Sequence, residues 1–222
     1  MKRIGLLGGT FNPVHFGHLR SAVEVQIGFA LDSVCFIPSA IPPHKDSSCV
    51  ADAMDRLEMI RMAISDYSPL TVSDVELKRS GPSYTIDTVK HFKTFQTAHT
   101  DFYLIVGLDA FLEIDTWKSF RELFDLVPFI VMSRPGSNYS DSSEELKNLG
   151  NFLDAKISKG YYFSEQDSCY IHEVCKPVYI CEVSQIDISS TKIRRMAQKG
   201  EPICFLVPSK VEHFIKSRGL YK

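Results

Sequence analysis

The sequence predicts an α/β fold in which a doubly wound parallel sheet carries helices on both faces. Two observations lead to this prediction. Short apolar runs alternate along the chain with segments whose apolar residues recur at helical spacing. A glycine-rich turn lies between the first apolar run, residues 4–7, and the first helical pattern, residues 19–30. The 222 residues, 44% hydrophobic and 23% charged, are sufficient for a single soluble globular domain.

The individual elements follow from hydrophobic periodicity. Strands are expected at residues 4–7, 33–37, 71–75, 102–106, 127–132 and 177–183, and helices at residues 19–30, 54–64, 85–95, 190–198 and 209–217. A polar, serine-rich stretch at 136–143 is predicted to be a surface loop, and residues 159–175 show too little periodicity for an assignment.

The helix expected at residues 54–64 has one apolar face. Leu57, Ile60 and Ile64 share one face and are predicted to point into the core. Arg56 and Arg61 fall outside that stripe and are therefore predicted to be solvated.

The turn at residues 8–18 contains the residue types that bind phosphate. Gly8 and Gly9 allow backbone N–H groups to approach a ligand closely. The start of the following helix offers unpaired N–H groups and a partial positive charge. His15 and His18 can donate hydrogen bonds to phosphate oxygens. The combination favours a nucleotide site over a plain glycine loop with two surface histidines, although no lysine closes the turn as in a P-loop.

This turn also resembles a known motif. Its form, Gly-Gly-Thr-Phe-Asn-Pro-x-His-x-Gly-His, is similar to the HxGH motif of the nucleotidylyltransferase superfamily, and specifically to that of the bacterial nicotinate-nucleotide adenylyltransferases. The segment 188–194, Ile-Ser-Ser-Thr-x-Ile-Arg, resembles the second signature of that superfamily, and residues 211–221 resemble its last helix. The resemblance implies a Rossmann-like nucleotidylyltransferase domain over residues 1–222, with C-terminal helices from about residue 190.

The resemblance implies adenylyl transfer from ATP, with Mg²⁺, to nicotinate mononucleotide, which yields nicotinate adenine dinucleotide and pyrophosphate. It makes His15 and His18 catalytic and implies no protein metal ligand. The implied ATP contacts are Gly8, Gly9, Thr10, Phe11, His15, His18, Gly107, Asp109, Ser190, Thr191 and Arg194. The implied mononucleotide contacts are Asn12, Lys45, Tyr84, Thr85, Trp117 and Arg134.

Several of these residue types suit the implied roles. The forked guanidinium of Arg194 fits phosphate, although Ser190 beside it is also a normal helix cap. The flat face of Trp117 can stack on a pyridine ring. The helix expected to start at Thr85 offers N–H groups to a carboxylate. Asp46 stands next to Lys45 and opposes a phosphate contact there.

Composition narrows the remaining classes. The net charge of −2 does not favour binding to nucleic acid or to acidic membranes. No apolar run reaches the length of about 18 residues that a membrane span needs, and the chain enters a strand directly. A cytoplasmic location is therefore expected. Six cysteines are expected to be reduced thiols, and the spacing of Cys169, Cys175 and Cys181 is wide for zinc. Two alternatives stay open: a sibling transferase with nicotinamide mononucleotide or phosphopantetheine as acceptor, and a non-catalytic nucleotide-binding module.

Overall fold

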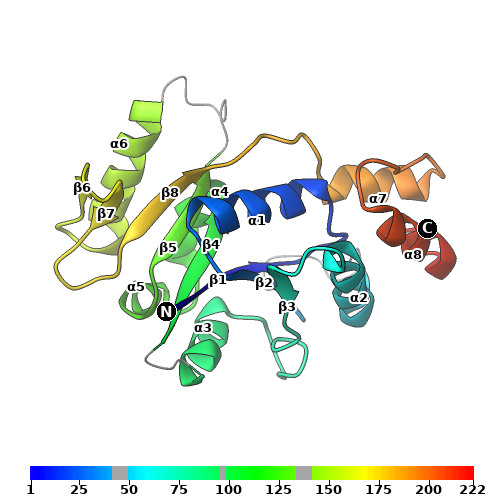
Figure 1. The fold of residues 1–222 in the computed structure, drawn as a ribbon, viewed down its shortest axis with the longest axis horizontal. Helices are drawn as coiled ribbons and strands as arrows, with labels where there is room; N and C mark the ends of the chain where they lie inside the picture. The colour runs from blue at the N-terminus through cyan, green and yellow to red at the C-terminus, as the bar shows by residue number, and fades with distance from the viewer. Residues whose placement is uncertain (42–49, 96–98, 134–141) are drawn as a thin grey trace.

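The computed structural model describes residues 1–41, 50–95, 99–133 and 142–222, and for residues 142–146 it describes the backbone alone. One eight-stranded sheet forms the centre of the molecule, in the order β3-β2-β1-β4-β5-β8-β7-β6 (Figure 1). The strands are β1 Lys2–Gly9, β2 Ser33–Pro38, β3 Leu70–Val72, β4 Thr100–Gly107, β5 Phe129–Ser133, β6 Tyr162–Ser164, β7 Cys169–Ile171 and β8 Val178–Glu182. The first six strands in spatial order are parallel, whereas β7 runs antiparallel to both β8 and β6.

Helices connect and cover these strands. They are α1 Phe16–Gly28, α2 Ala53–Ile64, α3 Thr85–Thr94, α4 Leu108–Leu112, α5 Phe120–Leu126, α6 Ser142–Phe152, α7 Ser190–Gln198 and α8 Ser209–Arg218, with a 3₁₀ turn at Ile114–Thr116 and a π turn at Leu153–Ile157. Helix α6 and the β6–β7 hairpin lie at one end of the molecule, and α7 and α8 at the other (Figure 1). In the described ranges, no helix combines the length and apolar character needed to cross a membrane.

The sheet separates two hydrophobic cores because side chains alternate along each strand. Leu6 and Leu104 face one core, which also takes residues of α3, α4, α5 and α6. Leu7 and Ile105, the next residues along β1 and β4, face the other, with residues of α1, α2, α7 and α8. This two-sided burial confirms the predicted doubly wound α/β class.

The order of the strands determines where a ligand can bind. Strand β1 pairs with β2 on one side and with β4 on the other, so the chain winds away from β1 in both directions. Open α/β sheets bind ligands beyond the carboxyl ends of the strands at such a switch point. The turn after Gly9 and the segment after Gly107 therefore belong to one edge of the sheet.

Most predicted elements are confirmed, and the differences are local. Strand β3 covers Leu70–Val72 instead of 71–75, and Ser142 and Ser143 begin α6 instead of ending a loop. The stretch 159–175, which had no assignment, contains the β6–β7 hairpin. Its strands have three residues each, too short to show a period.

Candidate active site

The turn after β1 is built on a buried phenylalanine. Phe11 has a positive φ of 48° and its side chain is buried. A Cβ at Gly9 would lie 2.9 Å from the Phe11 ring, so the ring requires glycine at that position, whereas a Cβ at Gly8 would meet nothing within 4 Å. The Phe11 and His18 rings form a T-shaped pair with 5.1 Å between their centroids. Phe11 thus supports the site from below, and Gly8 lies on its open side.

The two histidines lie together at the start of α1. His15 is the N-cap residue, is 5% exposed, and stacks on His18 with 3.7 Å between ring centroids. The backbone N–H of His15 donates to Nδ1 of His18 at 3.3 Å. A ring nitrogen that accepts a hydrogen bond carries no proton, so neutral His18 holds its proton on Nε2. The ring of His18 is half-buried, and Nε2 is its donor.

Arg56 was predicted to be solvated, and that prediction is wrong. Its side chain is 1% exposed, and burial lowers the pKa of its guanidinium. The group donates to the backbone oxygens of Ala51 at 2.9 Å, of Thr10 at 2.8 Å and of Ser39 at 2.7 Å. These oxygens precede α2, follow β1 and follow β2, so a single side chain joins three segments. Hydrogen bonds to carbonyls satisfy the donors that burial would otherwise leave unpaired.

Asn12, an expected mononucleotide contact, is also buried, with 4% exposure. Its side-chain oxygen accepts from the backbone N–H of Ala51 at 3.1 Å and from the hydroxyl of Tyr221 at 2.8 Å. Both partners belong to the protein's own scaffold. Sequence reasoning did not single out Arg56 or Tyr221 for this site, because no local pattern marks either of them.

Helix α7 brings the second signature to the same turn. Its N-cap is Ser189, whose hydroxyl accepts from the N–H of Lys192, so the cap is one residue earlier than Ser190. Ser190 instead donates from its hydroxyl to the Pro13 carbonyl at 2.9 Å. Arg194 donates to the Asn12 carbonyl at 2.9 Å and to the Thr191 hydroxyl at 3.3 Å. Two signatures more than 170 residues apart in the chain are therefore in direct contact.

The other side of the switch point is formed by β4 and α4. Gly107 ends β4 and is the N-cap of α4. Asp109 is exposed in the first turn of that helix. Both residues therefore lie at the carboxyl edge of the sheet, as a nucleotide contact requires.

The expected acceptor residues lie on two neighbouring segments. Helix α3 begins at Thr85 with Tyr84 as its N-cap, which confirms the predicted helix start. Trp117 follows the 3₁₀ turn and is half-buried against the core. The next residue, Lys118, places its Nζ 4.5 Å from the centroid of the Tyr84 ring and 3.2 Å from a carboxylate oxygen of Asp87. These contacts tie the Trp117 segment to the first turn of α3.

Two of the expected contacts, Lys45 and Arg134, lie outside the described residues. Within the described residues, no three His, Cys, Asp or Glu side chains are grouped so as to hold a metal ion. Cys169, Cys175 and Cys181 are free thiols.

A doubly wound sheet with a histidine-bearing, glycine-rich turn at its switch point defines a class of nucleotide-binding protein, and comparison with known families agrees. The cytidylyltransferase-like family model matches residues 6–196. The chain belongs to this family and, within it, to the nicotinate-nucleotide adenylyltransferases. Membership in a nucleotidyltransferase family implies that a divalent metal ion takes part.

The relatives match over the whole chain. A protein of Desulfatibacillum aliphaticivorans named "Probable nicotinate-nucleotide adenylyltransferase" is 42% identical, and the alignment covers 99% of this chain and 99% of the relative. A protein of Geotalea uraniireducens with the same name is 39% identical, with 99% and 98% covered. Among solved structures, the nicotinic acid mononucleotide adenylyltransferase of Plasmodium falciparum, complexed with NaAD, has a TM-score of 0.73 at 18% identity and covers 100% of this chain and 98% of its own. That likeness supports the fold.

Proposed function

We propose that the protein transfers the adenylyl group of ATP to nicotinate mononucleotide in the cytoplasm, a step of NAD biosynthesis. The observation that carries the proposal is the meeting of the 8–18 turn with α7 at the switch point of the sheet, through Ser190 and Arg194. The acceptor is supported by the names of the full-length relatives.

The reaction requires positioning more than a protein nucleophile. A 5′-phosphate oxygen of the mononucleotide attacks the α-phosphorus of ATP in line. A new P–O bond forms, the bond from the α-phosphorus to the oxygen bridging to the β-phosphate breaks, and pyrophosphate leaves. The attacking phosphate is already an anion near neutral pH, so no strong general base is needed. The chain's task is to align the two phosphates and to stabilise the developing charge.

In this scheme His18 donates from Nε2 to a phosphate oxygen of ATP, and His15 holds the His18 ring in place. The positive end of the α1 dipole lies beside His18 and favours the same anion. Ser190, Thr191 and Arg194 lie on the triphosphate side, and Gly107 and Asp109 on the nucleoside side. Mg²⁺ accompanies the triphosphate, where phosphate oxygens and water would supply most of its ligands.

The acceptor subsite combines Trp117 with the start of α3. Stacking on Trp117 serves nicotinate and nicotinamide rings equally, so the choice between them depends on the polar end of the ring. The backbone N–H of Thr85 and the positive end of the α3 dipole favour a carboxylate, whereas the N–H of Tyr84 donates to the Pro82 carbonyl. An amide NH₂ at the same place would face donors with a donor, and each buried group left unpaired costs about 1–3 kcal/mol.

A pyrophosphate-release assay across nicotinate mononucleotide, nicotinamide mononucleotide and phosphopantetheine tests the proposal. We expect the highest kcat/KM with the acid form of the pyridine nucleotide. Equal values for the acid and the amide would contradict the carboxylate subsite but leave adenylyl transfer intact. ATP binding with no pyrophosphate from any acceptor would instead favour the non-catalytic module. Trp117→Ala is the control, because it should weaken both pyridine acceptors and keep most of the preference.

A further inference from the structure

We infer that Tyr221 is a positioning residue for adenylyl transfer, because its hydroxyl fixes Asn12 in the 8–18 turn. This inference rests on the proposed function. The residues that follow α8 would then belong to the scaffold of the active site.

The chain is directed to the turn by the end of α8. Gly219 caps α8 with a φ of 63°, a conformation that glycine adopts without strain. The N–H of Leu220 donates back to the Ile215 carbonyl at 3.0 Å, which closes the helix. Arg218 pairs with Asp55, in the first turn of α2, at 2.9 Å. These contacts hold the last residues against α2. Tyr221 therefore lies close enough to Arg56 for the two groups to interact electrostatically.

The hydroxyl of Tyr221 then reaches Asn12. It donates to the side-chain oxygen of Asn12 at 2.8 Å. Burial raises the pKa of the Tyr221 phenol, although the positive charges of Arg194 and Arg56 oppose that shift. The phenol therefore keeps its proton throughout the physiological pH range and remains a donor. The Asn12 oxygen is buried, so water cannot readily replace the lost donor.

This hydrogen bond is one of a set that fixes the oxygens of the turn. The oxygens of residues 10, 12 and 13 accept from Arg56, Arg194 and Ser190, and the Asn12 side chain accepts from Tyr221. A turn that binds phosphate must present N–H groups to the anion and keep its oxygens away from it. The four donors do this by fixing the direction of each oxygen. Tyr221 is the donor supplied by the end of the chain.

Tyr221→Phe tests the inference, since it removes the hydroxyl and keeps the ring. The matched control is Tyr67→Phe, because Tyr67 also donates its hydroxyl to a side-chain oxygen, that of Gln26, at 3.0 Å. Tyr67 precedes β3, so it lies at the amino edge of the sheet, opposite the turn. Kcat for nicotinate mononucleotide and the Kd of ATP by calorimetry are measured at a temperature far below Tm.

We expect Tyr221→Phe to lower kcat about tenfold and to raise the Kd of ATP about threefold, the scale of one buried hydrogen bond. Tyr67→Phe should change neither, even if both variants lose similar thermal stability. Combined with Ser190→Ala, Tyr221→Phe should be non-additive, because both donors hold the same turn. Wild-type kcat and ATP affinity in Tyr221→Phe would overturn the inference. A wild-type protein that binds ATP without pyrophosphate release would contradict the proposed function, and the calorimetry would still decide the role of Tyr221.

Discussion

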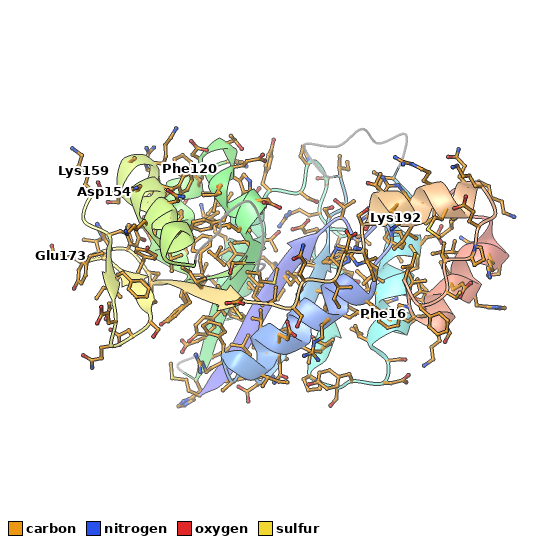
Figure 2. All side chains as sticks on the ribbon, turned by 90° about the horizontal axis from the view of Figure 1, so that it is seen from above. Phe16, Phe120, Asp154, Lys159, Glu173 and Lys192 are labelled. Carbon is orange, nitrogen blue, oxygen red and sulfur yellow. The ribbon has the colours of Figure 1, made fainter. Side chains whose placement is uncertain are left out.

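Two polar turns of the molecule each hold a histidine, one at the switch point of the sheet and one at the end formed by α6 and the β6–β7 hairpin, but they use it differently (Figure 1). Figure 2 shows Phe16, at the start of α1, and Lys192 of α7 in one half, and Asp154, Lys159 and Glu173 at the opposite end. At that opposite end, Nδ1 of His172 accepts from the N–H groups of Val174 and Cys175, and Nε2 lies 3.0 Å from the Lys159 carbonyl. Both ring nitrogens of His172 thus have hydrogen-bond partners in the segments that flank the β6–β7 hairpin.

The difference lies in where the partners come from. The partners of His172 are 2, 3, 13 and 14 residues away in the chain. The groups that hold the 8–18 turn are 46, 177, 182 and 209 residues away. A turn held by distant segments is fixed only once the whole sheet has formed, and its N–H groups remain directed to one edge. We take this as the physical distinction between a binding turn and a structural one.

The largest expected effect comes from the active-site histidine. His18→Ala removes the Nε2 donor, and the loss of one preorganised donor to a developing charge costs about 2.7–4 kcal/mol of transition-state stabilisation. We expect kcat to fall by about 10²–10³-fold. Steady-state pyrophosphate release measures this, with circular dichroism to verify the fold. A well-folded His18→Ala protein with the wild-type kcat would remove the catalytic assignment.

Arg194→Ala should have the next largest effect. The variant loses a charged donor, worth about 1.5–3 kcal/mol, on the proposed triphosphate side. The Kd of ATP should rise by roughly tenfold or more, and that of nicotinate mononucleotide much less, as calorimetry would measure. Arg195→Ala, an exposed residue of the same helix, is the control and should bind ATP normally. Equal weakening of both substrates would limit Arg194 to its bond with the Asn12 carbonyl.

In contrast to His18→Ala, His172→Ala should lower stability and leave turnover unchanged. It leaves two backbone N–H groups without their acceptor, at a cost of about 1 kcal/mol in the free energy of unfolding, since the half-exposed site admits water. Kcat should stay at the wild-type value. Urea unfolding and the pyrophosphate assay on the same sample separate the two quantities. A large loss of turnover with unchanged stability would show that the hairpin end takes part in catalysis.

The smallest effect on turnover is expected from alkylation of the cysteines, which should leave turnover unchanged. Burial raises the pKa of the Cys169 and Cys175 thiols, so their thiolate fraction at pH 8 is low. Cys204 is exposed near the other end. Alkylation followed by peptide mass mapping should find Cys204 modified roughly tenfold faster than either hairpin cysteine, since reactivity follows the thiolate fraction and access. Modification of Cys175 at the rate of Cys204 would show that the hairpin cluster opens in solution.

Local patterns were sufficient to predict the fold class and the local conformation of the segments that form the candidate site. Hydrophobic alternation and helical spacing identified β1, β2, β4 and the helices that cover them, because burial on one face or on both imposes those periods. The turn at residues 8–18 and the helix start at Thr85 were also predictable, since glycine and capping signals act within a few residues. Short strands such as β6 and β7 were not, because three residues show no period.

The tertiary structure alone decided how the turn is held. The spacing of Arg56 on α2 predicted exposure, yet it is buried because the carbonyls of Thr10 and Ser39, 46 and 17 residues away, accept its protons. Tyr221 gave no signal because its acceptor, Asn12, is 209 residues away. A buried polar side chain is stable where its partners converge, and convergence is a property of the folded sheet. The sequence by itself therefore predicted which turn is the candidate nucleotide site, and the tertiary structure determined which residues hold that turn in place.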